Sequence, residues 1–130
     1  MATAGEKITP SSLASVVQEE LTAEWVDVTV NGGYASQGGA HDPQVRLIGS
    51  RVYMKGGVDS TGLTASTNET AVMTVPAGWE PVKPYYVMVA SSAPDRAGRA
   101  LIGSDGDIDL LLPSSVGSYY LFDGISWDVE

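Results

Sequence analysis

The sequence VRLIGSRVYMK, residues 45–55, carries the clearest structural signal in the chain. Gly49-Ser50 at its centre is the Gly-first pair that type II′ hairpin loops favour. If Ile48 pairs with Arg51, apolar side chains meet on one face of the two strands. The apolar pairs are Leu47 with Val52 and Val45 with Met54, and Arg46 meets Tyr53 on the other face. The stretch therefore predicts an antiparallel hairpin with one core-facing side.

The composition extends this prediction to the whole chain. With 130 residues the chain suits one domain, and 15 Gly and 7 Pro beside 43% apolar residues favour many short strands. A net charge of −9 repels phosphate backbones, so nucleic acid and anionic lipid are not expected partners. The chain has no Cys, and no segment approaches the roughly 20 apolar residues that span a membrane. We expect an all-β domain made as a cytosolic chain.

A second hairpin is predicted at Asp105-Gly106, a pair typical of type I′ turns. This turn would align Leu101 with Leu110 and Gly103 with Ile108. Alternating or apolar runs predict further strands, near residues 24–30, 69–75, 84–91, 117–122 and 125–129. The pattern indicates an antiparallel β-sandwich, jelly-roll-like, of about nine short strands.

One short α-helix is predicted near the N-terminus, over about residues 10–21, with Thr9 as cap and Pro10 at the first helical position. Its apolar residues form one narrow stripe. The stripe consists of Leu13, Val16, Val17 and Leu21. Two alternatives remain for what covers this stripe: the chain's own β-domain, or copies of the same helix in a short parallel bundle.

The strand YYVMVA, residues 85–90, is apolar on both faces. A two-layer sandwich covers only one face of each sheet, so the other face needs another element of the chain or a neighbouring copy. Three prolines in the approach, at positions 76, 81 and 84, preset the backbone φ angle and stiffen the loop. A stiff loop suits a segment that anchors packing.

Catalysis is not expected. The chain has one His, no Cys, and no nucleophile-elbow or zinc-protease motif. The aspartates at 105, 107 and 109 are explained as turn and strand acids, with Asp107 and Asp109 on the face opposite Ile108 and Leu110. Their run lacks the Gly and distal Glu of an EF-hand loop. We therefore expect no cofactor and no metal.

Five pieces of the sequence, in order, resemble the C-terminal receptor-binding head domains of bacteriophage tail fibres and minor tail proteins. The pieces are the tryptophan-led strand Trp25–Val28, the strand Val52–Val58, the proline loop Val75–Pro81, the turn Ser104–Ile108 and the closing strand Leu121–Trp127. Together they cover most of residues 24–130. One departure is Glu80, which stands where the family usually has an arginine.

The resemblance implies a helical neck over residues 1–23 and a β-sandwich head over 24–130, assembled as a homotrimer in the virion tail. It implies binding to a host cell-surface saccharide or cell-wall polymer, and contact with other phage tail proteins. Both apolar surfaces would then meet their own copies. The implied trimer interface is Leu13, Val16, Val17, Leu21, Tyr85, Tyr86, Val87, Met88 and Val89. The alternative is a structural tail or virion-surface domain that binds no receptor.

Saccharide recognition needs an aromatic face for the sugar's C–H surface and planar polar groups for its hydroxyls, on loops over a rigid scaffold. The loop residues that meet this need are Tyr34, His41, Asp42 and Trp79. Tyr34 and His41 are expected on the surface of the glycine-rich loop 31–43. For Trp79, and for Trp25 and Trp127 on predicted strands, packing against the core is the alternative.

Overall fold

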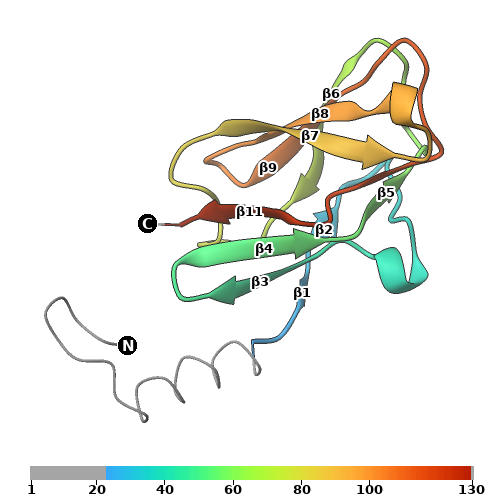
Figure 1. Cartoon of the computed structure of the whole chain (residues 1–130). Helices are drawn as coiled ribbons and strands as arrows, with labels where there is room; N and C mark the ends of the chain where they lie inside the picture. Colours follow the sequence, from blue (N-terminus) through green and yellow to red (C-terminus); the bar gives the residue numbers. More distant parts are fainter. Residues whose placement is uncertain (1–22, 130) are drawn as a thin grey trace, which may run out of the picture.

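The computed structural model describes residues 23–129, and its chain is built almost entirely from short antiparallel strands (Figure 1). The predicted neck helix, with Leu13, Val16, Val17 and Leu21, lies outside the described residues. The strands of the first half are β1 (Val26–Asp27), β2 (Thr29–Val30), β3 (Gln44–Ile48), β4 (Arg51–Lys55), β5 (Gly57–Asp59) and β6 (Asn68–Thr74). Those of the second half are β7 (Tyr85–Ser91), β8 (Gly98–Ile102), β9 (Asp107–Leu111), β10 (Tyr119–Leu121) and β11 (Ile125–Asp128).

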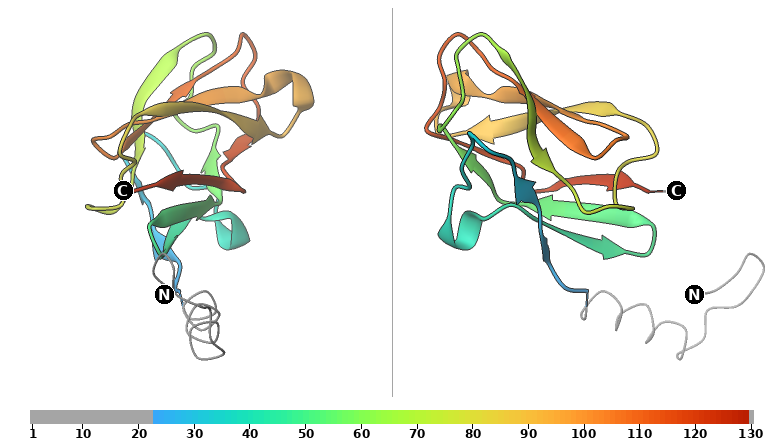
Figure 2. Two further views of the ribbon diagram at one scale, coloured as in Figure 1. Left: turned by 60° about the vertical axis from the view of Figure 1, so that its left-hand side comes forward. Right: turned by 180° about the vertical axis from the view of Figure 1, so that it is seen from behind.

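These strands form two antiparallel sheets, one of four strands in the order β1-β3-β4-β11 and one of seven in the order β2-β6-β9-β8-β7-β10-β5. The two sheets lie one above the other in the views of Figures 1 and 2. Two 3-10 turns, η1 (Gly39–His41) and η2 (Pro94–Arg96), interrupt the loops. The expected all-β antiparallel sandwich is confirmed, with eleven short strands over residues 23–129 where about nine were predicted.

The core lies between the sheets and takes side chains from both. It contains Val45, Val52, Met54 and Trp127 from the smaller sheet, and Met73, Val89, Ala100, Ile102, Ile108, Leu110 and Tyr120 from the larger. No charged side chain among the described residues is buried. Burial of apolar surface, about 25 cal/mol per Å² removed from water, is therefore the main force that holds the two layers together.

The β3–β4 hairpin has the predicted register, with Ile48 opposite Arg51 and Val45 opposite Met54. Gly49 at the first loop position has φ of +62°, as a type II′ turn requires. Val52 and Met54 are buried, and Tyr53 on the opposite face is exposed. The residues of one tight turn thus fix which face of the smaller sheet meets the core.

The β8–β9 hairpin was predicted one residue out of register. Ile102, not Gly103, lies opposite Ile108, and Leu101 lies opposite Asp109. The loop has three residues before the chain pairs again, because Gly106 takes φ of +91° and its N–H bonds to the Gly103 carbonyl at 3.0 Å. This is a type I turn closed by a left-handed glycine rather than a type I′ turn. A one-residue slip exchanges the faces, so Leu101 turns away from the core that it was expected to join.

The predicted strand at residues 24–30 is divided between the two sheets. Val26 pairs with Val45 of β3 in the smaller sheet, and Val30 pairs with Met73 of β6 in the larger one. Between them the Val28 N–H bonds to the Pro43 carbonyl at 2.9 Å and its side chain is buried. Val26 is 39% exposed, so the valines that alternate at positions 26, 28 and 30 do not all reach the core.

The chain changes sheet again at Gly56, between β4 and β5. Gly56 has φ of +76°, and a Cβ at this position would overlap the backbone carbonyl of Asp42. Its N–H bonds to the Asp123 carboxylate at 2.7 Å, and its carbonyl accepts the Phe122 N–H at 2.8 Å. Phe122 and Asp123 belong to the segment that returns from β10 to β11. Gly56 therefore connects the crossing from β4 to β5 with the crossing from β10 to β11. Strands also change sheet at the corners of orthogonal β-sandwiches.

Candidate functional site

A groove opens where the proline loop, which joins β6 to β7, passes the end of β11. It encloses about 420 Å³ and its walls come from three distant segments of the chain. The lining residues are Arg51, Pro81, Val82, Lys83, Pro84, Tyr85, Trp127 and Asp128. The loop side is mostly apolar and the β4–β11 side is polar. A groove of this size, apolar with a few convergent polar groups, has the character of a small-ligand site.

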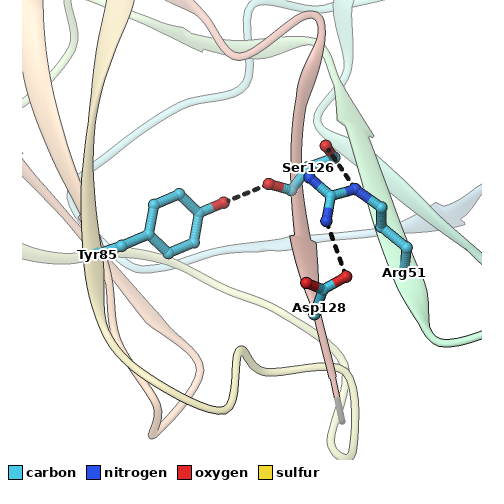
Figure 3. A network of polar contacts seen from close by, with 4 residues as sticks. All are labelled: Arg51, Tyr85, Ser126 and Asp128. Atoms are coloured by element: carbon cyan, nitrogen blue, oxygen red, sulfur yellow. Dashed lines mark hydrogen bonds and ion pairs between the residues drawn. The ribbon is translucent and has the colours of Figure 1, made fainter.

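The polar end of the groove is an ion pair between neighbouring strands. Arg51 of β4 lies opposite Asp128 of β11, and its Nη1 donates to the Asp128 Oδ1 at 2.7 Å (Figure 3). The Arg51 Nε donates to the Ser126 hydroxyl at 3.1 Å. Both charged side chains are substantially exposed, at 43% and 58%, so the pair adds little to stability. Its effect is to hold the guanidinium plane in one orientation, leaving its other N–H groups for a ligand.

Tyr85 closes the groove from the other sheet. Its hydroxyl, on β7 of the larger sheet, donates to the backbone carbonyl of Ser126 on β11 at 2.8 Å (Figure 3). Burial raises the pKa of the Tyr85 hydroxyl to about 12, so the group is neutral over the physiological range. The tyrosine ring is therefore held across the junction of the two sheets as a rigid wall.

The proline loop is tied down at both sides of the groove. The Val82 N–H bonds to the Asp128 carbonyl at 3.3 Å, and the Trp127 indole N–H donates to the Trp79 carbonyl at 2.7 Å. Trp79 packs against the core, the alternative that the sequence left open, and it does not line the groove. Val82, between Pro81 and Lys83, is 56% exposed although its backbone is fixed. The loop thus presents an apolar side chain to solvent from a rigid frame.

Tyr34 was predicted as an exposed ligand residue, and the structure places it partly against the core. Its hydroxyl donates to the Glu69 Oε2 at 2.7 Å, and the same carboxylate accepts the Thr67 hydroxyl. The hydrogen bond from Tyr34 lowers the pKa of Glu69, with a smaller contribution from Thr67, and the bond to Glu69 raises the pKa of Tyr34. These contacts tie loop 31–43 to β6.

His41 and Asp42 are exposed at the end of η1, as expected of loop residues. Asp42 accepts a hydrogen bond from Ser36 and, with Ser36 and Pro43, lines a shallow groove of about 190 Å³. Among residues 23–129, the described contacts join none of Tyr34, His41 and Trp79 to one another. His41 and Asp42 are thus neighbours, Tyr34 and Trp79 are each held by structural contacts of their own, and the groove at Arg51 and Tyr85 was not predicted.

The strand β7 divides the predicted interface residues between its two faces. Tyr85, Val87 and Val89 face the core. Tyr86 and Met88 point outward and are 64% and 67% exposed. On the same outer face, Arg99 lies over the Tyr86 ring at 4.9 Å, next to Leu101 and Leu111. The outer side of the larger sheet therefore carries an uncovered apolar strip.

The three aspartates of the second hairpin line a further groove, of about 530 Å³, on that outer side. Each carboxylate accepts a hydrogen bond from the surrounding backbone or side chains. Asp105 accepts from the Asp107 N–H, Asp107 from the Thr74 hydroxyl, and Asp109 from the Ala71 N–H. Ala71 sits at φ of +49° in the bulge of β6, so Asp109 supports a strained backbone. Within the described part of the chain no three metal-binding side chains gather, and no helix could span a membrane.

Comparison with solved structures shows that this architecture shares its fold with a phage receptor-binding protein. The crystal structure of the receptor binding protein gp15 of Listeria phage PSA superposes on 93% of this chain and 80% of its own, with a TM-score of 0.61 and 20% sequence identity. No protein-family model matches the sequence, and no curated protein matches it. The fold implied by the resemblance to phage tail head domains is confirmed.

Proposed function

We propose that this chain is a receptor-binding domain of a bacteriophage tail, located in the virion, which binds a host cell-surface saccharide or cell-wall polymer. The observation that carries the proposal is the fold shared with a phage receptor-binding protein over 93% of the chain. The groove at Arg51, Tyr85 and Asp128 supports it, because its walls are fixed before any ligand arrives. Preformed sites lose little entropy on binding. The domain is expected to bind without turnover.

We further propose that the working form is a homotrimer, attached to other tail proteins. Tyr86 and Met88 support this part, since both are about two-thirds exposed on a strand of the larger sheet. Large apolar side chains gathered on one face of a soluble domain mark an interaction surface. A neighbouring copy would bury this strip, and the apolar stripe predicted at Leu13 to Leu21 would provide a second contact.

The test is cell labelling. The full chain, fused to a fluorescent protein, is added to bacteria on which a phage that carries the chain forms plaques, and to resistant strains. Saturable labelling of susceptible cells, competed by unlabelled chain and by cell-wall polysaccharide from the same cells, is expected. If susceptible cells are not labelled, the result would contradict receptor binding and favour the alternative, a structural tail domain. Release of soluble fragments from the polysaccharide would contradict binding without turnover.

A further inference from the structure

We propose that the groove between the proline loop and β11 is the ligand site, and that it takes a sugar ring that carries an acidic substituent, a carboxylate or a phosphodiester. The inference rests on the proposed function, since it names the receptor chemistry. It follows from three features of the groove: an apolar wall, a fixed guanidinium, and beside them a cation that has no ion-pair partner within residues 23–129.

The apolar wall suits the C–H face of a sugar ring. Pro81, Val82, Pro84 and the Tyr85 ring contribute it. Val82 is more than half exposed although its backbone N–H is fixed to the Asp128 carbonyl. The two prolines limit the backbone on either side. Because the loop backbone is already held, little backbone entropy is lost when a ligand covers the Val82 side chain, so contact with a ring is favourable.

The charges of the groove select the ligand's substituent. Among the described residues that line it, Arg51 and Lys83 are cations and Asp128 is the one carboxylate, so these residues carry a net positive charge in a chain of net charge −9. Lys83 is exposed and has no ion-pair or hydrogen-bond partner among the described residues. At physiological salt the screening length is about 8 Å, so a bound group responds to these side chains more than to the chain's total charge. An oxyanion between Lys83 and Arg51 is therefore favoured.

The hydrogen-bonding groups left in the groove fit the rest of a sugar. Arg51 uses its Nε and Nη1 on Ser126 and Asp128, and its remaining N–H groups can donate to ring or substituent oxygens. Asp128 uses Oδ1 for Arg51, which leaves Oδ2 to accept from a hydroxyl. A bare anion would use the cations but not this acceptor or the apolar wall. The groove therefore matches an acidic glycan better than a small inorganic anion.

The experiment is a titration of the isotope-labelled full chain, followed by NMR signals of the Val82 methyl groups and the Trp127 indole N–H. The probes are a neutral oligosaccharide, an oligogalacturonate, a glycerol-phosphate teichoic acid and a hexaglutamate peptide. Saturable shifts are expected with the oligogalacturonate or the teichoic acid. The probe that causes the shifts shows whether the site binds a carboxylate or a phosphodiester. Lys83→Ala should weaken that affinity about tenfold, as loss of one charge-assisted hydrogen bond does.

The matched control is Lys55→Ala, which removes an equal charge from the outer face of the smaller sheet, where Lys55 lies over the Trp25 ring. The Lys55→Ala variant should bind the acidic glycan with the same affinity as the unaltered chain. Equal shifts with the neutral oligosaccharide, or with hexaglutamate, would overturn the inference, as would shifts centred on Tyr34 or His41. If susceptible cells are labelled and Lys83→Ala leaves labelling unchanged, receptor binding stands and this site is wrong. If no cell is labelled and no glycan shifts a signal, both proposals fail.

Discussion

The hydroxyl of Tyr85 donates to the backbone carbonyl of Ser126 at 2.8 Å, and this bond joins the two sheets of the sandwich (Figure 3). Tyr85 begins β7 of the larger sheet, and Ser126 lies in β11, an edge strand of the smaller one. Every residue that lines the candidate groove is on or next to the elements that this bond connects. The shape of the groove therefore depends on it.

Replacing Tyr85 by Phe should lower the free energy of unfolding by about 1 kcal/mol, since a partly buried carbonyl loses its partner while the ring is kept. Urea denaturation of the full chain measures the change. Tyr53→Phe is the control, because Tyr53 lies exposed on the outer face of the smaller sheet. Equal stability of the two variants would show that the bond between the sheets contributes nothing.

The raised pKa of Tyr85 predicts that the domain loses stability at alkaline pH. Its folded pKa of about 12 lies above the ordinary value of 10.0, so the folded state keeps a proton that the unfolded chain releases. The contribution of Tyr85 to the free energy of unfolding is complete below pH 10 and decreases as the pH rises toward 12. Denaturation at several pH values should show this decrease, and Tyr85→Phe should make it smaller. An unchanged slope in the variant would assign the loss to other tyrosines.

Gly56→Ala should destabilise the domain by about 3 kcal/mol or more, because the added methyl overlaps the Asp42 carbonyl in addition to straining a left-handed backbone. Gly78→Ala is the matched variant. Gly78 has φ of +89° and nothing within 4 Å of an added Cβ, so it should lose only the roughly 1–2 kcal/mol of backbone strain. Thermal denaturation compares them, and similar losses would mean that the crossing at Gly56 can relax.

The Tyr34–Glu69 hydrogen bond predicts acid sensitivity. The folded pKa of Glu69 lies below its ordinary value of 4.5, so its contribution to stability is present above that pH and is lost as the pH falls through the folded value. Tyr34→Phe should reduce this part of the acid transition, measured by denaturation between pH 3 and 6, conditions chosen around that value. If Tyr34→Phe instead weakens cell labelling at constant stability, Tyr34 contacts ligand as first predicted.

Met88→Asp should convert the proposed trimer to monomers, since a charge would replace an apolar side chain that is 67% exposed in the uncovered strip. Light scattering on the full chain measures the solution mass. Tyr53→Asp, which places the same charge on the outer face of the smaller sheet, should leave the mass unchanged. A monomeric parent chain would contradict the trimer directly.

The sequence predicted where the strands lie better than it predicted how they pair and which sheet each strand joins. The hairpin at Gly49-Ser50 was placed correctly, because a two-residue turn fixes its own register. The hairpin at Asp105-Gly106 was predicted in the wrong register. The Asp105 side chain accepts a hydrogen bond from the Asp107 N–H and stabilises a loop that is one residue longer than predicted. The changes of sheet at Val28 and Gly56 leave no periodic signal, since alternation continues through each of them. Only the tertiary pairing shows which sheet a strand joins.

The candidate groove was missed for a similar reason. Arg51 and Asp128 are 77 residues apart, and they meet only because β4 pairs with β11. The prediction favoured loop aromatics, and two of them proved to have structural contacts: Tyr34 bonds to Glu69, and the Trp79 carbonyl accepts from Trp127. The available signal was Val82-Lys83 between two prolines, an apolar and a charged residue on a stiffened loop.

The change of sheet at Val28 has a mechanical consequence. The chain enters the described domain at Ala23, pairs with β3 through Val26 and Asp27, and pairs with β6 through Thr29 and Val30. A tension applied at the N-terminal side would therefore reach both layers within a few residues, through β1 and β2, which are edge strands of their sheets. Extension from this side would break the β1–β3 pairing first and the β2–β6 pairing next, and it would expose Val28 between the two steps.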